Sequence, residues 1–155
     1  MYERILIPTD GSEVAEVAVD HALDLAEKYD AEIHALYVVD TDAVAYGLGT
    51  EQVDRLRQGN FQGMTELREA AEAATGSVRD QAEARGLSVV EHYSGGRPHD
   101  LIATYAEDND IDLVVMGSHG RSGVRRALLG SVTERTLRST HVPVLVVDVR
   151  PDEPE

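Results

Sequence analysis

The stretch that decides the fold runs from Asp112 to Val132 and reads DLVVMGSHGRSGVRRALLGSV. It opens on a short apolar run, Leu113 to Met116, which is typical of a buried strand because it is brief and rich in β-branched residues. Ser131 then begins a predicted helix. Between strand and helix start, within fourteen positions, lie Gly117, Gly120, Gly123 and Gly130. The sequence therefore predicts a strand, a pliable loop and a helix start in succession.

This glycine-rich loop combines backbone freedom with positive charge. Glycines let a backbone approach a ligand and adopt positive φ, and free N–H groups at a helix N-terminus favour an anion. Between positions 121 and 138 only Glu134 is acidic, against the basic residues Arg121, Arg125, Arg126, Arg135 and Arg138. A local basic patch on an acidic chain indicates a small anion such as phosphate, and a solvated helix face is the alternative.

Length and composition set the class of protein. The chain has 155 residues, 42% of them hydrophobic, which suffices for one domain with a substantial core. We expect one nucleotide-binding domain over residues 1–149 and an acidic tail over residues 150–155. The chain has no cysteine, so disulfides and thiolate metal sites are excluded. No apolar run approaches the roughly 20 residues of a membrane span and no signal peptide precedes the first strand, which predicts a cytoplasmic protein.

The charge is strongly negative. The chain carries 29 acidic and 14 basic residues, a formal net charge of −15, which argues against nucleic acid or an anionic membrane as partner. Lys28 is the one lysine of the sequence. An acid-rich and lysine-poor composition suggests a halophilic protein adapted to a high-salt cytoplasm, and an ordinary acidic protein is the alternative.

Apolar runs and helical periodicity alternate along the chain. Strands are expected at residues 4–9, 31–39, 87–93, 113–116 and 143–149. Helices are expected at residues 15–27 with Ser12 as N-cap, at 64–85, at 99–107 after Pro98, and at 131–139 with Val132, Thr136 and Leu137 facing inward. Residues 94–97 are expected to form a turn. Residues 40–63 are expected to form a long loop with a helical turn at 52–57, serving as a lid or dimer contact or remaining disordered.

This alternation predicts a single-domain α/β fold, a doubly wound five-stranded parallel sheet with helices on both faces. Ligands of such folds bind outside the carboxyl ends of the strands, at a topological switch point. Asp10, Val38 and Gly117 all lie at predicted carboxyl ends and can meet in one crevice. A Walker A loop is excluded because Lys28 lies in the first helix, and a dinucleotide fingerprint because only Gly11 follows the first strand.

The glycines instead have the spacing Gly117-x2-Gly120-x9-Gly130-Ser131. With the segments ILIPTDGS, YVVD, GGRPHDLI, LLGSVTERTLRST and HVPVLVV in that order, the chain resembles the universal stress protein family (UspA-like). The resemblance is to its ATP-binding branch, whose motif is G-x2-G-x9-G-[ST]. It implies an adenine nucleotide alpha hydrolase-like fold, a homodimer, and ATP lying across the strand ends.

The resemblance also implies site residues. By position, Asp10 and Val38 would lie on the adenine side and Met116 and Gly117 on the ribose side, with the phosphates at the loop and the following helix start. The predicted nucleotide-binding residues are Pro8, Thr9, Asp10, Val38, Met116, Gly117, His119, Gly120, Arg121, Gly130, Ser131, Val132 and Thr133.

The residues themselves leave alternatives for several of these roles. Asp10 is equally suited to a plain turn or helix cap, and Ser131 to an ordinary N-cap. His119 could touch a phosphate or only fill the loop. His21 and His34 lie in a predicted helix and strand without a clustered acid or second histidine, so no metal site is expected.

Catalysis would require further groups. A hydrolase or kinase needs a base near the γ-phosphate and carboxylates for a divalent cation, and residues 117–131 contain no Asp or Glu. We therefore expect no catalytic residue and an ATP-binding regulatory module for the stress response, with any Mg²⁺ carried mainly by the phosphates. The alternatives are a slow ATPase or autophosphorylating enzyme using Asp10 and a loop serine, and a nucleotide-free chaperone or adaptor. A homodimer is expected through the apolar edge strand from Pro143 to Val149.

Overall fold

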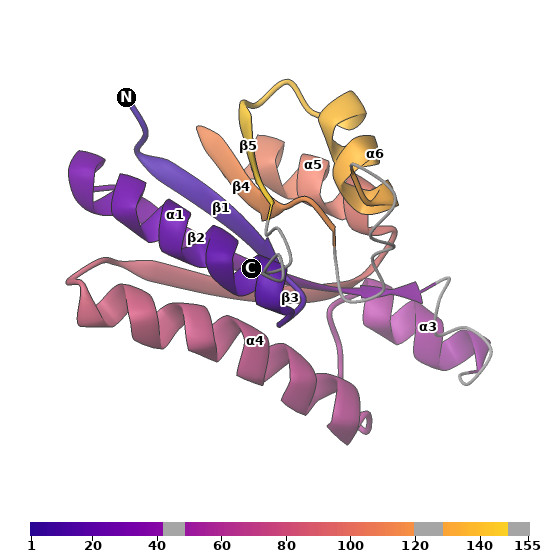
Figure 1. The fold of residues 1–155 in the computed structure, drawn as a ribbon. Helices are drawn as coiled ribbons and strands as arrows, with labels where there is room; N and C mark the ends of the chain where they lie inside the picture. Colours follow the sequence, from indigo (N-terminus) through magenta and orange to yellow (C-terminus); the bar gives the residue numbers. More distant parts are fainter. Residues whose placement is uncertain (42–48, 120–128, 149–155) are drawn as a thin grey trace, which may run out of the picture.

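The computed structural model describes residues 1–41, 49–119 and 129–148. Five parallel strands form one sheet in the order β3-β2-β1-β4-β5 (Figure 1). The strands are β1 (Arg4–Thr9), β2 (Glu32–Asp40), β3 (Val89–Gly96), β4 (Leu113–Gly117) and β5 (Val144–Val147). The predicted five-stranded parallel sheet is confirmed.

Helices cover both faces of this sheet. They are α1 (Glu13–Tyr29), α3 (Thr50–Arg57), α4 (Thr65–Ala84), α5 (Pro98–Asp108) and α6 (Ser131–Ser139). Figure 1 shows α1 and α4 on one face and α5 and α6 on the other, which is the doubly wound arrangement expected from the sequence. Among the described residues, no helix combines the length and apolar character needed to cross a bilayer.

The core is split between the two faces because side chains alternate along each strand. Ile5 and Ile7 of β1 pack with the apolar stripe of α1, including Val19 and Leu23. Leu6 points the other way and packs with Ile102 of α5 and its neighbours. The central strand β1 is therefore buried on both sides, which fixes the position of its carboxyl end.

The third strand lies two to three residues further along the chain than the sequence predicts. Strand β3 begins at Val89 and continues through Gly96, because it pairs with β2 up to the partners Asp40 and Gly96. The expected turn over residues 94–97 is therefore wrong for its first three residues. Strand β3 is an edge strand, and its Val90 is 39% exposed.

The expected long loop contains a well-packed helix. Helix α3 is longer than the predicted turn at 52–57, and its Leu56 is fully buried together with Phe61 and Met64. A Cβ on Gly95 would lie 2.7 Å from the Cβ of Leu56, so this glycine allows α3 to pack directly against the end of β3. The disorder alternative is therefore wrong for residues 50–64. Residues 42–48 lie outside the described part, so the lid and dimer alternatives keep their status as predictions.

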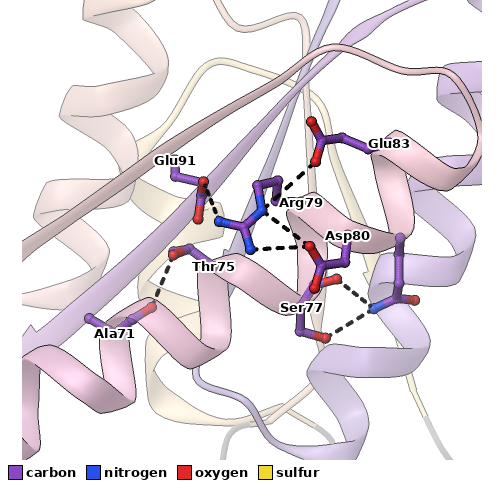
Figure 2. Close-up of polar contacts among 8 residues, drawn as sticks. Ala71, Thr75, Ser77, Arg79, Asp80, Glu83 and Glu91 are labelled. Atoms are coloured by element: carbon purple, nitrogen blue, oxygen red, sulfur yellow. Dashed lines mark hydrogen bonds and ion pairs between the residues drawn. The ribbon is translucent and has the colours of Figure 1, made fainter.

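Helix α4 is anchored by arginines as well as by its apolar face. Figure 2 shows Arg79 between Asp80 of its own helix and Glu91 of β3. Arg79 Nη1 lies 3.3 Å from Glu91 Oε2. Arg85, at the carboxyl-terminal cap of the helix, bonds Asp24 of α1 at 2.6 Å. These pairs are exposed and each contributes little to stability, but they connect α4 to β3 and to α1.

Two predictions near the carboxyl-terminal end are corrected. Leu137 of α6 is 39% exposed, so its predicted inward orientation is wrong. Thr136 is buried as predicted, together with Thr133. Thr136 can be buried because its hydroxyl donates to the carbonyl of Val132 at 2.7 Å. The last strand covers residues 144–147 rather than 143–149, and Val149 lies outside the described residues. Strand β5 does form an edge of the sheet, as predicted.

Candidate functional site

The switch point of the sheet lies between β1 and β4. From β1 the chain proceeds to β2 and β3 on one side, and from β4 to β5 on the other. Strands β1 and β2 pair over six positions, whereas β1 and β4 pair only at Ile5–Leu113 and Leu6–Val114. The carboxyl-terminal halves of β1 and β4 are thus not joined by the ladder, and such a parting is where ligands of open α/β sheets bind.

The end of β1 leads into a turn whose backbone donors are satisfied by side chains. The Gly11 N–H donates to Thr9 Oγ1 at 3.2 Å, and the Ser12 N–H donates to Asp10 Oδ1 at 2.9 Å. The Ala15 N–H then donates to Ser12 Oγ at 3.3 Å, so Ser12 caps α1 as predicted. Asp10 therefore has the turn role that the sequence left as an alternative.

The end of β4 lies against the start of α1. A Cβ on Gly117 would lie 2.5 Å from Val14 Cγ1, so only glycine allows this close approach of strand and helix. Met116, the preceding residue, is buried, and Val38 of β2 packs against the same apolar cluster. The two positions assigned to opposite ends of the nucleoside thus lie on one apolar cluster beside the switch point.

Helix α6 begins beside the end of β4. The Gly130 N–H donates to the Ser118 carbonyl at 2.6 Å, and Thr133 Oγ1 donates to the Gly117 carbonyl at 2.8 Å. A Cβ on Gly130 would lie 3.0 Å from His119 Cα, so this contact also needs a small residue. The structure thus brings together four of the predicted site residues: Gly117, His119, Gly130 and Thr133.

The first turn of α6 has no side-chain cap. Its N-cap is Gly130, which has no side chain to accept a hydrogen bond from the first helical N–H groups. The first helical hydrogen bond is Glu134 N–H to the Gly130 carbonyl, which leaves the N–H groups of residues 131–133 without an intrahelical acceptor. These donors lie at the positive end of the helix dipole, where a phosphate is favoured.

The remaining predicted residues are less closely connected. Pro8 and Thr9 are at the end of β1, with Thr9 buried and its hydroxyl engaged in the turn. Ser131 is exposed at the first position of α6, and Val132 beside it is half-buried. Gly120 and Arg121 lie outside the described residues, so the guanidinium predicted to bind phosphate stays a prediction.

Sequence reasoning missed two polar residues of this site. Ser118 is 1% exposed, its Oγ donates to Asp148 Oδ1 at 2.6 Å, and the same Oγ lies 3.1 Å from His119 Nδ1. Ser118 belongs to the glycine-rich loop, and that position in the sequence could have marked it as a site residue. Asp148 follows β5, thirty positions later, and only the parallel pairing of β4 with β5 brings it near.

A second polar cluster lies on the α5 face of the sheet. His34 Nε2 bonds Glu32 Oε1 at 2.7 Å, and His34 Nδ1 bonds the Tyr105 hydroxyl at 2.7 Å. The expectation of no acid near His34 is therefore wrong, because residues two apart share one face of a strand. Burial lowers the pKa of His92. The pKa of Tyr105 is raised, mainly by burial and to a smaller extent by the negative charge of Glu32.

This second cluster borders a cavity of about 400 Å³ that contains none of the predicted nucleotide-binding residues. The cavity is lined by Leu36, Val90, His92, Ser94, Leu101, Thr104, Tyr105, Asp108 and Asn109. Within the described ranges, no group of three or more His, Cys, Asp or Glu side chains is placed to hold a metal ion.

Comparison with known proteins agrees with the motif and the fold. The model of the universal stress protein family matches residues 1–148. Universal stress protein MJ0531 of Methanocaldococcus jannaschii is 40% identical over 148 residues, covering 95% of this chain and 82% of that protein. The solved structure of MJ0577, a universal stress protein of the same organism, has a TM-score of 0.79 at 32% identity and covers 98% of this chain and 99% of that chain.

A more distant structure shares the fold. It is a universal stress protein in complex with cAMP, with a TM-score of 0.66 at 24% identity, covering 95% of this chain and 97% of that chain. The switch point between β1 and β4, the glycine motif and the match over nearly the whole sequence lead to one assignment. This chain belongs to the universal stress protein family.

Proposed function

We propose that this chain binds ATP and acts as a nucleotide-dependent regulatory module of the stress response. The phosphates would lie at the N-terminus of α6 and the nucleoside would extend past Gly117 toward Val38. A relative of the same fold forms a complex with cAMP, which supports an adenine nucleotide as the ligand class.

The observation that carries this proposal is the uncapped start of α6. Three successive N–H groups, those of Ser131, Val132 and Thr133, lack an intrahelical acceptor and follow a glycine N-cap. The Ser131 side chain is exposed and the Val132 side chain is half-buried. Thr133 is buried, and its hydroxyl donates to the Gly117 carbonyl. Backbone donors therefore supply most of the phosphate recognition, with the Ser131 hydroxyl as an exposed addition.

The same residues support retention of the nucleotide rather than turnover. Residues 117–131 contain no carboxylate, and Asp10 uses Oδ1 to hold the Ser12 N–H. A general base and a carboxylate-held divalent cation are the usual needs of phosphoryl transfer. We therefore expect Mg²⁺ to enter with the phosphates, coordinated mainly by them.

Calorimetric titration with ATP tests the proposal, using the wild-type chain and Ser131→Asp. A carboxylate at the first position of α6 favours the helix by about 0.3–1 kcal/mol through the dipole, so the fold should be kept. The same charge repels a phosphate at this position, and we expect ATP affinity to fall at least about tenfold.

Thr50→Asp is the matched control, because Thr50 holds the first position of α3 and is exposed. It should leave ATP affinity within about twofold. Absence of ATP binding by the wild-type chain, or equal affinity in Ser131→Asp, would contradict the proposed site. Phosphate released from bound ATP, or label transferred to the protein, would favour the alternative of a slow ATPase or autophosphorylating enzyme.

We also propose that two copies pair along β5. Strand β5 is an edge of the sheet, and its Val144, Leu145 and Val146 are only half-buried, so its backbone and apolar side chains can join a second copy. Sedimentation at micromolar concentration should show a dimer that Leu145→Lys dissociates. A monomeric wild-type chain would refute this pairing.

The net charge of −15 leads to a further proposal, adaptation to high salt. Self-repulsion among acidic groups weakens when the Debye length falls from about 10 Å at 0.1 M salt to about 3 Å at 1 M. We expect the urea midpoint to rise markedly between these two KCl concentrations. Full stability in dilute buffer would refute the adaptation without bearing on ATP binding.

A further inference from the structure

Ser118 connects two side chains that are far apart in the sequence. It follows β4 directly, and its N–H donates to the Val147 carbonyl at 2.8 Å. Its Oγ lies 2.6 Å from Asp148 Oδ1 and 3.1 Å from His119 Nδ1. Because Ser118 is buried, its hydroxyl has these two neighbours as its partners among the described residues.

Counting protons fixes the direction of both hydrogen bonds. A serine hydroxyl carries one proton, and a carboxylate can only accept. The Ser118 proton therefore goes to Asp148, and the remaining lone pairs of Oγ can only accept from the imidazole. His119 must then carry a proton on Nδ1, which leaves Nε2 of the neutral ring as a bare acceptor.

This arrangement differs from that of a hydrolytic triad. In a triad the histidine lies between the serine and the carboxylate and takes the serine proton. Here the serine lies between the other two groups, and its hydroxyl is buried and already donates to Asp148. The cluster is suited to orient the imidazole rather than to attack a substrate.

The backbone of His119 adjoins the start of α6. His119 Cα would lie 3.0 Å from a Cβ built on Gly130, so the backbone of His119 abuts the N-cap of the helix proposed to bind phosphate. His119 itself is half-buried. Among the described residues no hydrogen bond is formed by its Nε2.

We propose that Ser118 and Asp148 form a positioning pair that holds His119 in its Nδ1-protonated form, so that Nε2 accepts a hydrogen bond from the nucleotide. This inference rests on the proposed ATP binding. A bare phosphate oxygen is itself an acceptor, so the neutral ring pairs instead with a donor of the nucleotide. The donors available are the ribose hydroxyls and the adenine amino group.

The tautomer can be measured without any nucleotide, by ¹⁵N NMR of the labelled histidines at about pH 8.5, where imidazoles are neutral. In the wild-type chain we expect His119 to be protonated at Nδ1 and bare at Nε2. In Asp148→Ala the Ser118 hydroxyl is freed to donate to Nδ1, so the proton should move to Nε2. In Ser118→Ala both partners are lost, and Nε2 should again gain the proton, which it prefers in free histidine.

Asp20→Ala is the matched control, since Asp20 is an exposed carboxylate on α1 and its loss changes the net charge equally. It should leave the His119 signals unchanged. A wild-type His119 with its proton on Nε2, or an unchanged tautomer in Asp148→Ala, would overturn the positioning pair. Because this measurement uses protein without nucleotide, its result tests the positioning pair independently of ATP binding.

Titration with analogues then tests the ligand contact. ATP is compared with 2′-deoxyATP, 3′-deoxyATP and inosine triphosphate, each of which lacks one donor. We expect one analogue to bind the wild-type chain about fivefold more weakly than ATP, and this difference to vanish in Asp148→Ala. Equal binding of all four nucleotides by the wild-type chain would overturn the acceptor role of Nε2.

Discussion

Two helices begin at the carboxyl edge of the same sheet, α1 after β1 and α6 beside the end of β4, and their first turns are built differently. At α1, side-chain oxygens of Thr9, Asp10 and Ser12 accept from the backbone of the turn and first helical residues. Glu13 and Glu16 add negative charge to the same turn. A side chain thus accepts from one of the first helical N–H groups of α1, and two carboxylates lie near the positive end of its dipole.

At α6 the N-cap is a glycine and the first three helical residues are neutral. Gly130 offers no side chain, Ser131, Val132 and Thr133 carry no charge, and Glu134 is the one acidic residue of the first turn. Both helix starts lie at the edge where ligands of this fold bind, so position alone does not decide which one is a site. We therefore base the proposal of α6 on capping, because α1 has a side-chain cap and α6 has none.

Gly117→Ala should have the largest effect on stability, because Gly117 is the point where the two regions touch. The added Cβ would lie 2.5 Å from Val14 Cγ1, and a valine side chain has few rotamers with which to move away. We expect the free energy of unfolding in urea to fall by about 1–3 kcal/mol.

Two variants separate this clash from a general effect of replacing glycine. Gly76→Ala in α4 meets only Arg79 at 3.4 Å and should stabilise the chain by about 0.5–1 kcal/mol. Val14→Ala combined with Gly117→Ala should lose less than the sum of the single changes. Strict additivity would show that the two regions do not share this contact.

Ser12→Ala should have an intermediate effect that is confined to stability. It removes the oxygen that accepts the Ala15 N–H, and the free energy of unfolding should fall by about 1 kcal/mol. Affinity for ATP, measured by calorimetry, should stay within about twofold, since this helix start is satisfied by its own side chains. Loss of ATP binding in a variant that stays folded would remove the distinction between the two helices.

Ser131→Ala should give the smallest change in stability and the opposite pattern. Ser131 is exposed and its loss should alter the free energy of unfolding by no more than about 0.5 kcal/mol. Loss of one hydroxyl contact to phosphate should weaken ATP binding about fivefold or more. If Ser12→Ala weakened ATP binding more than Ser131→Ala, the assignment of the two helix starts would be reversed.

Local signals in the sequence were sufficient for most of the fold. Ser12 as the cap of α1, Pro98 at the start of α5 and the helix at residues 131–139 all depend on neighbouring residues, and the structure has them where expected. The switch point also followed from the order of strands and helices. The glycine motif pointed to the helix start that the structure leaves uncapped.

Features that depend on tertiary pairing were predicted less well. The end of β3 is set by its partner β2, and α3 is held by the contact of Leu56 with Gly95, which no local pattern reveals. Asp148 reaches Ser118 only because β5 lies beside β4. Leu137 was expected to be buried because it is apolar, but α6 instead buries threonines whose hydroxyls are bonded locally or to β4.

The comparison between the two helix starts can be tested directly by following backbone amide signals while ATP is added. The account predicts that the amide resonances of Ser131, Val132 and Thr133 shift as ATP saturates the protein, because their N–H groups receive the phosphates. Those of Glu13 and Val14 should move far less. Shifts centred on the start of α1, or none at the start of α6 under saturating ATP, would contradict the account.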